Sequence, residues 1–358
     1  MRLGHFESVS PVCPICRTAG RAPSPLSIHQ RLRGEGDWIE EGALVCGETM
    51  CQAEYPIIDG VPFIVANLAG VISGQLGALR GRRDLSAYTE SLIGDAAGPA
   101  SQHERDRYQV SSYARSHYGD LDRELPLDPT RSFISVIGPA LEVAAAADSG
   151  GVWLDCGCGP GRSSFELAAA TGGDVLGIDL NVGMLGVAVG ATRGQLAHPL
   201  RKVGLVYGRR DFEVAFEAAE RVDFWAVDVL ALPFTDGSIA GALSVNVLDC
   251  IASPLGHLRE LGRVLSDGAA VAIGSPFDWS TSATPLEGWL GGHSGRATHG
   301  GASETELARL LAEGDPAGAM TGLVIEGAAR EVDWEVYVHE RASMRYRVHL
   351  VRAQRAPR

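Results

Sequence analysis

The sequence has little lysine and no long apolar run. Lys202 is the single lysine, and 44 acidic residues outnumber the 31 basic ones, which gives a net charge of −13. A chain with this charge repels a polyanion such as nucleic acid unless a local basic patch overrides the average field. The longest apolar candidate, residues 136–147, carries Pro139 and Glu142 and is shorter than the roughly 18 to 20 residues of a membrane-spanning helix. The sequence therefore predicts no membrane segment and favours small-molecule chemistry.

The N-terminal residues show no sign of a secretory signal. The start MRLGHFESVSPVC contains no apolar signal core, so we expect a cytoplasmic protein. The length of 358 residues, with 45% apolar and 21% charged residues, is typical of a globular protein with one large and one smaller domain.

Four of the seven cysteines lie within the first 51 residues. Cys13 and Cys16 form a C-x2-C pair, while four residues separate Cys46 from Cys51. Such pairs bring thiolates together around one tetrahedral ion, and a structural zinc supplies folding free energy to a segment with too small a core. The sequence predicts a zinc site at these four residues. Free or redox-active cysteines are the alternative.

We assign residues 1–70 to a small domain and residues 71–110 to a linker with one helix near 84–93. Residues 43–46 are predicted to form a strand, and Asp59 and Gly60 a turn between two strands within residues 55–65. Through C-x2-C, a later Leu-x-Cys and a final Tyr-Pro-Ile-x-Asp-Gly-x-Pro, this segment resembles zinc-ribbon domains that precede or partner some RNA and protein methyltransferases. It carries five Arg against eight Asp and Glu, so it offers no basic face for RNA.

Residues 111–358 alternate helical and strand patterns. This alternation predicts an α/β fold, with a doubly wound, mostly parallel sheet of seven strands. A helix over 131–147 comes first. The expected strands are 151–155, 174–179, 222–228, 238–246, 268–275 and a final antiparallel pair, 331–339 and 344–351.

A glycine-rich turn between the first strand and its helix indicates a nucleoside site. Its spacing is Asp155-x-Gly157-x-Gly159-x-Gly161, and the opening acid would repel a phosphate but suits the sulfonium and ammonium groups of S-adenosylmethionine. Asp179 ends the second strand, where an acid binds both ribose hydroxyls, and Asp228 is placed to accept from the adenine amino group. The candidate cofactor-binding residues are Asp155, Gly157, Gly159, Gly161, Arg162, Asp179, Asp228 and Asn246.

Together these features resemble a class I S-adenosylmethionine-dependent methyltransferase. A closer resemblance is to the C-terminal methyltransferase domain of ovothiol synthases, which make and N-methylate 5-thiohistidine. The matching runs are Tyr113 to Asp120 with His117-Tyr118-Gly119, Asn246-x-x-Asp249, Ser275-Pro-Phe-Asp-Trp279 and Trp289-Leu-Gly-Gly292. The sequence shows no counterpart of the iron-dependent sulfoxide synthase domain of those enzymes.

The resemblance implies N-methylation of 5-thiohistidine or a related thiol-histidine, by in-line transfer that needs orientation and exclusion of water. The implied catalytic residues are Asn246, Asp249, His117 and Tyr118, and the implied substrate contacts are His117, Tyr118, Ser275 and Trp279. A structural role is the alternative for each. An rRNA or tRNA base methyltransferase with a zinc ribbon is the alternative function. A non-enzymatic binding module is disfavoured by the three strand-end acids.

Overall fold

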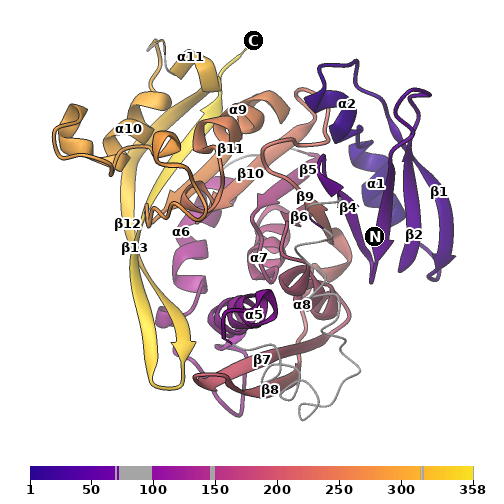
Figure 1. Ribbon diagram of the computed structural model, residues 1–358, viewed down its shortest axis with the longest axis horizontal. Helices are drawn as coiled ribbons and strands as arrows, with labels where there is room; N and C mark the ends of the chain where they lie inside the picture. The colour runs from indigo at the N-terminus through magenta and orange to yellow at the C-terminus, as the bar shows by residue number, and fades with distance from the viewer. Residues whose placement is uncertain (69–70, 72–98, 146–149, 315, 317, 358) are drawn as a thin grey trace.

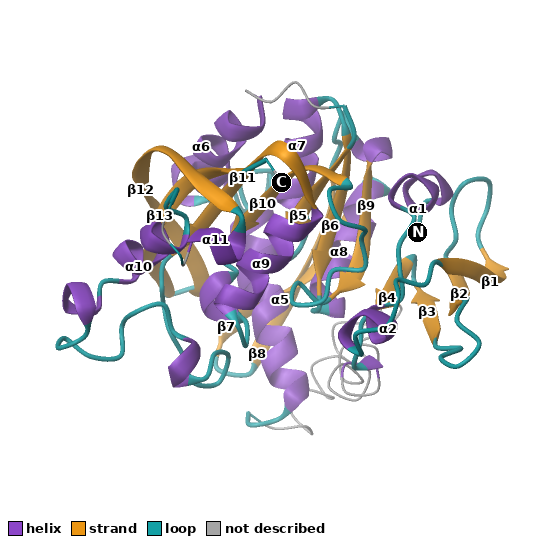
Figure 2. Ribbon diagram, turned by 90° about the horizontal axis from the view of Figure 1, so that it is seen from above, coloured by secondary structure: helices purple, strands orange, loops and turns teal. Residues whose placement is uncertain are grey.

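A computed structural model describes residues 1–68, 71, 99–145, 150–314, 316 and 318–357 (Figure 1). The helix expected near 84–93 lies outside these residues. In the described part of the chain, one mixed sheet of 11 strands has helices on both faces (Figure 2). None of the described helices has the length and apolar character to cross a membrane.

Seven of these strands come from the region after residue 150, in the order β9-β6-β5-β10-β11-β13-β12. The first five are mutually parallel, and β13 is antiparallel to both of its neighbours. Strands β5, β9 and β10 are buried along their whole length, as expected for parallel strands covered on both faces. Their bounds are β5 Val152–Cys156, β6 Asp174–Asp179, β9 Val222–Val227, β10 Ile239–Val245, β11 Leu265–Ser275, β12 Leu323–His339 and β13 Ala342–Arg355.

Four N-terminal strands extend this sheet, in the order β1-β2-β3-β4. The last one pairs in parallel with β9 through Phe63 to Ala226 and Ile64 to Val227, so it satisfies backbone groups that a free edge would leave unpaired. The α/β fold is thus confirmed, but the sheet has 11 strands where the sequence predicted seven. The N-terminal bounds are α1 Leu3–Val9, α2 Pro14–Thr18, β1 Leu26–Arg33, β2 Glu41–Cys46, β3 Glu54–Ile58 and β4 Val61–Ile64.

The remaining helices surround the sheet, and a separate hairpin, β7 with β8, lies beside α5 (Figure 1). Helix α5 begins at Gln102, inside the segment expected to be a linker, and the Ser101 side chain caps it by accepting from Glu104 N. The bounds are α5 Gln102–Tyr118, α6 Ile134–Ala145, α7 Arg162–Thr171, α8 Val182–Thr192, β7 Gln195–Val203, β8 Val206–Glu213, α9 Pro254–Val264, α10 Ser303–Leu310 and α11 Gly318–Thr321, with short 3-10 turns at Pro129–Arg131, Ala219–Arg221, Leu248–Cys250, Leu286–Gly288 and Thr298–Gly301.

The long hairpin of β12 and β13 reaches from the sheet to α5 (Figure 1). The pairing register of β12 with β13 shifts between Glu326 and Arg330, which marks a β-bulge. Gly327 lies within this bulge and has a positive φ of 71°. A bulge of this kind bends the strand. Beyond the bulge, Tyr337 N donates to Ser116 Oγ of α5 at 2.9 Å. The Tyr337 hydroxyl donates to the Arg201 carbonyl of β7 at 2.7 Å. The far part of β12 is therefore fixed beside α5.

Candidate functional site

A cavity of about 330 Å³ lies at the carboxyl ends of β5, β6, β9 and β10, which is where ligands bind in open α/β sheets. No Lys or Arg is among the described residues that line it, so its charged lining is acidic. The sheet side of the lining consists of Gly157, Gly159, Asp179, Leu180, Asn181, Met184, Val227, Asp228, Val229, Val245, Asn246 and Val247.

The glycines of the predicted cofactor loop divide into two roles. Gly157 and Gly159 line the cavity, and a Cβ at Gly157 would lie 2.5 Å from Val247 Cγ2. Gly161 does not line the cavity. A Cβ there would lie 2.6 Å from both Ala188 Cβ and Phe224 Cζ, so this glycine permits the start of α7 to pack closely on α8 and β9.

Asp155 lies beneath this loop and does not line the cavity. It is 3% exposed, and one carboxylate oxygen accepts from the hydroxyls of Ser163 and Ser164, each at 2.6 Å. Burial raises its pKa to about 6, and the two serine hydrogen bonds oppose that rise. This oxygen holds the first turn of α7, and the contact of Asp155 with a cationic ligand stays a prediction.

The other two predicted acids do line the cavity. The two oxygens of Asp179 accept from Gly159 N at 2.9 Å and Asn181 N at 2.7 Å. Burial raises the pKa of Asp179, and these backbone hydrogen bonds act against the rise. Asp228 Oδ1 accepts from Leu230 N at 2.8 Å. Both carboxylates are thus held by backbone donors at the ends of β6 and β9.

Arg162 and Tyr118 tie the glycine-rich loop to α5 and do not line the cavity. The Tyr118 hydroxyl donates to the Pro160 carbonyl at 2.7 Å. Arg162 donates to the His117 carbonyl and to Asp120, both at 3.2 Å, and to Glu166 at 2.7 Å. These partners give both side chains a structural role, and their predicted ligand contacts stay predictions.

The opposite side of the cavity is built from distant segments that the sequence did not single out as one site. It comprises Gln109, Tyr113 and His117 of α5, Phe133, Trp334 of β12, Cys250 and Ile251.

Aromatic rings form most of this side. His117 stacks on Phe133 with ring centroids 3.9 Å apart, and Trp334 lies 5.3 Å from Phe133 and 6.1 Å from Tyr113. We call Tyr113, His117, Phe133 and Trp334 the aromatic wall. Of these four residues, only Tyr113 and His117 lie in the run from Tyr113 to Asp120 that resembles ovothiol synthases. They are four residues apart, so α5 carries both on one face.

His117 is the titratable member of the wall. Burial, and secondarily the charge of Arg162, lowers its pKa well below the usual histidine value, so the ring is neutral at pH 7. Its Nδ1 is buried without a hydrogen-bond partner among the described residues. His117 lines the cavity, and its contact with a substrate stays a prediction; its Nδ1 would be available to a ligand.

Asn246 lines the cavity directly after the end of β10. Its φ of 59° lies in the left-handed region, where a non-glycine residue is strained. Both its side-chain Oδ1 and Nδ2 are buried, and neither has a partner in the described part of the chain. Strain combined with an unsatisfied amide points to a side chain positioned for a ligand.

Three other predicted residues lie outside the cavity lining. Asp249 accepts from Asp278 N at 2.7 Å, and Ser275 Oγ accepts from Phe277 N at 3.0 Å. Trp279 donates from its indole nitrogen to Ser303 Oγ at 3.0 Å. Burial raises the pKa of Asp249. These groups hold the loop that follows β11, and the predicted catalytic role of Asp249 and substrate contacts of Ser275 and Trp279 stay predictions.

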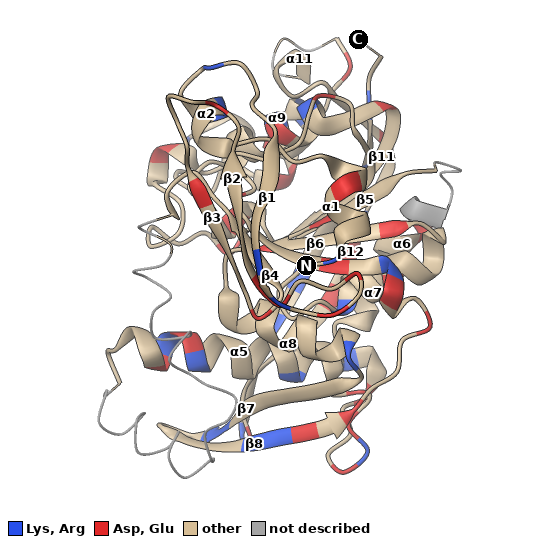
Figure 3. Cartoon of the chain, turned by 90° about the vertical axis from the view of Figure 1, so that its right-hand side faces the viewer, with Lys and Arg blue, Asp and Glu red and all other residues tan. Residues whose placement is uncertain are grey.

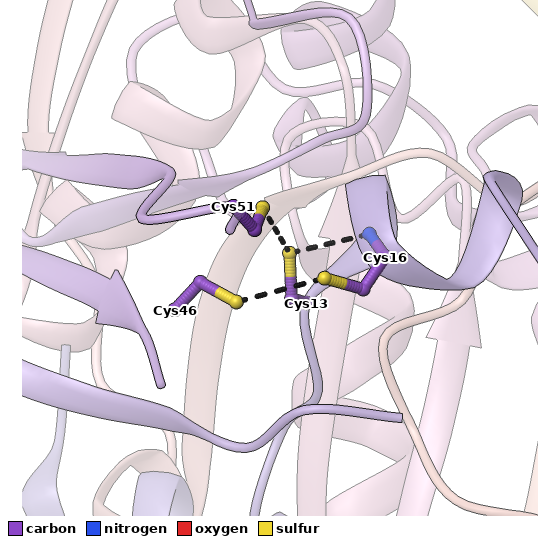
Figure 4. A group of neighbouring side chains, drawn as sticks. All are labelled: Cys13, Cys16, Cys46 and Cys51. Carbon is purple, nitrogen blue, oxygen red and sulfur yellow. Dashed lines mark hydrogen bonds between the residues drawn. The ribbon is translucent and has the colours of Figure 1, made fainter. Parts of the chain in front are cut away.

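The four N-terminal cysteines converge on one point (Figure 4). All four sulfurs lie within 4.8 Å of one another. Cys13 Sγ is 3.8 Å from Cys51 Sγ, and Cys16 Sγ is 3.7 Å from Cys46 Sγ. A tetrahedral zinc with Zn–S bonds of about 2.3 Å separates its sulfurs by about 3.8 Å. The donor set therefore fits a tetrahedral ion bound by four thiolates.

Residues 154–273 match the family model described as a methyltransferase domain, and that range spans β5 to β11. This part of the chain is therefore similar to a methyltransferase domain.

Among curated proteins, an uncharacterized 37.1 kDa protein in transposon TN4556 of Streptomyces fradiae is 32% identical over 163 residues. That alignment covers 45% of this chain, and the chain spans only 39% of the length of this relative. Among solved structures, an S-adenosylmethionine-dependent methyltransferase of Methanosarcina mazei is 22% identical, with a TM-score of 0.39 over 62% of this chain and 98% of the other. A geranyl diphosphate methyltransferase is 14% identical, with a TM-score of 0.43 over 70% and 97% of the two chains.

Replacement of Asp155 by Ala tests its structural role. The hydroxyls of Ser163 and Ser164 would lose their buried acceptor, so we expect the free energy of unfolding to fall by about 2–3 kcal/mol in urea denaturation. Asp211→Ala is the matched control, because the Asp211 carboxylate is 57% exposed in a surface pair with Arg209 and such pairs contribute about 0–1 kcal/mol. Equal stability of the two variants would contradict the assignment.

Proposed function

We propose that the protein transfers the methyl group of S-adenosylmethionine to a ring nitrogen of a small imidazole amino acid, 5-thiohistidine or a related thiol-histidine. One observation carries the proposal: a single cavity is lined by strand-end acids and by an aromatic wall whose buried polar atoms have no partner among the described residues. The resemblance of the run around His117 and of Asn246-x-x-Asp249 to ovothiol synthases supports the imidazole acceptor.

On the sheet side, we assign Asp179 to the ribose hydroxyls and Asp228 to the adenine amino group. The backbone at Gly157 and Gly159 would face the amino-acid end of the cofactor. The lining supports this assignment, because acidic groups with no Lys or Arg among the described lining residues suit a ligand with a sulfonium and an ammonium group. The bound cofactor supplies an activated methyl group.

On the other side, the aromatic wall would hold the flat acceptor ring. Methyl transfer forms an N–CH3 bond and breaks the S–CH3 bond, and the acceptor then loses one proton. The free nitrogen of neutral His117 is the group that would accept this proton or fix the reactive tautomer. Asn246 would orient the acceptor through its amide.

The distribution of charged residues on the protein surface supports a small acceptor. A polynucleotide needs an open basic track, whereas basic and acidic residues are interspersed on α5 and β8 (Figure 3). The β8 cation Arg210 already pairs with Asp122 at 2.6 Å.

We also propose a structural zinc ion on Cys13, Cys16, Cys46 and Cys51. The spacing of the sulfurs supports it, and a metal bound to all four would tie α2 to the end of β2. The backbone N–H of Cys16 donates to Cys13 Sγ at 3.5 Å, and that of Glu48 to Cys46 Sγ at 3.4 Å, as N–H groups do around thiolate ligands.

Asp179→Ala tests the cofactor assignment. The ribose hydroxyls would lose their acceptor, which costs roughly 1.5–3 kcal/mol, or about tenfold or more in affinity for S-adenosylmethionine in calorimetry. Asp174→Ala is the control, since Asp174 begins the same strand at its opposite end. Unchanged affinity in the Asp179 variant would refute the assignment.

The acceptor is tested with a panel of reduced 5-thiohistidine, histidine and a short RNA stem, with methylated product measured by mass spectrometry. We expect product from the thiolated histidine and none from RNA. Asn246→Ala should lower this turnover by tenfold or more while the affinity for S-adenosylmethionine changes less. Methylation of RNA alone would refute the imidazole acceptor and leave the methyltransferase intact.

Zinc content tests the cysteine site. We expect one equivalent of zinc on freshly purified protein and about half or less on a Cys16→Ser variant. Chelation should increase hydrogen exchange in β1 to β4 before it does so in β5 and β10, because metal loss removes folding free energy from the N-terminal segment. Less than about half an equivalent on the wild type would overturn the zinc assignment.

A further inference from the structure

We propose that Trp334 determines acceptor specificity: its indole N–H donates a hydrogen bond to a ring nitrogen or a thiolate sulfur of a planar nitrogen heterocycle held against Phe133 and Tyr113. This inference rests on the proposed function, because it takes the cavity to be the acceptor site. It adds a residue that the sequence did not identify and the chemical feature that this residue recognises.

The indole of Trp334 is buried and unpaired. The residue is 2% exposed and lines the cavity, and Nε1 has no hydrogen-bond partner among the residues that the structure describes. A buried tryptophan N–H usually has one. Trp225, Trp279 and Trp289 follow this rule, since their indole N–H groups donate to Asp223, Ser303 and the Thr284 carbonyl.

Two other tryptophans, Trp38 and Trp153, also have an indole nitrogen without a partner in the described chain. Neither lines the cavity. Trp334 is therefore distinguished by two observations together, a missing partner and a position at a ligand-sized space. The unpaired amide of Asn246 and the unpaired Nδ1 of His117 belong to the same lining.

The surroundings of Trp334 favour a flat ligand. Its ring centroid lies 5.3 Å from that of Phe133 and 5.9 Å from that of Tyr346, so packing against neighbouring rings restricts its orientation. The bulge near Gly327 and the Tyr337 contact to Ser116 bring this part of β12 to α5. The indole N–H is the one hydrogen-bond donor of this side chain. Because the ring is already held in place, donating to a ligand requires little reorganisation of the protein.

The charge of the lining defines what this donor can recognise. Without Lys or Arg in the described lining, an anionic or lone-pair atom of the acceptor must be bound by neutral donors. The indole N–H of Trp334 and the Nδ2 of Asn246 are such donors. An acceptor ring with no lone-pair atom next to the Trp334 N–H would leave that N–H without a hydrogen bond. We therefore expect the site to discriminate against such a ring.

Indole NMR signals of ¹⁵N-tryptophan-labelled protein test the inference, with the Trp334 signal assigned by its loss in Trp334→Phe. The protein is saturated with S-adenosylhomocysteine and titrated with 5-thiohistidine, histidine, pyridine-3-carboxylate and phenylalanine. We expect a bound nitrogen heterocycle to shift the NMR signal of the Trp334 indole proton downfield and to slow the exchange of this proton with water. Phenylalanine should do neither. Trp334→Phe should raise the acceptor KM tenfold or more and change the affinity for S-adenosylmethionine less than twofold.

Trp289→Phe is the matched control, because it loses an indole hydrogen bond outside the cavity, and it should leave the acceptor KM unchanged. If the pyridine moves the signal and the imidazoles do not, the imidazole acceptor is wrong and the role of Trp334 stands. If no heterocycle moves the signal, or if S-adenosylhomocysteine alone moves it, the inference is overturned even where methyl transfer is intact.

Discussion

The site depends on the hydrogen bonds that fix the end of α5 to the glycine-rich loop. Tyr118 donates to the Pro160 carbonyl, and Arg162 donates to the His117 carbonyl. Through these two bonds, the loop that would face the cofactor also positions the helix that carries Tyr113 and His117 of the aromatic wall. Any shift of the loop therefore moves His117 and Tyr113 relative to Asn246. Orientation of the two reactants is the main contribution a protein makes to an in-line methyl transfer.

The N-terminal segment supports the same site from the other edge of the sheet. Strand β4 pairs with β9 at Val227, the residue before Asp228, and both Val227 and Asp228 line the cavity. Arg17 also binds the Leu232 carbonyl and the Glu260 carboxylate. The segment that carries the cysteine cluster thus continues, through β4, into the strand that ends at the cavity.

Local motifs made much of this structure predictable from the sequence. The glycine turn, the acids that end β6 and β9 and the Asn181 cap of α8 depend on neighbouring residues, and each lies where it was expected. The sheet extension was missed because β4 pairs with a strand that is distant in the sequence. Phe133 and Trp334 were missed for the same reason, since only a bulged hairpin brings them together. Tyr118 and Trp279 lie in motif-like runs, but their polar atoms are used within the protein.

A crystal structure of the complex with S-adenosylhomocysteine and 5-thiohistidine tests the central claim most directly. The account predicts both ribose hydroxyls on Asp179, the cofactor sulfur facing Asn246, and the imidazole ring against Phe133 and Trp334. An acceptor bound away from the aromatic wall, or a ribose that does not contact Asp179, would contradict it.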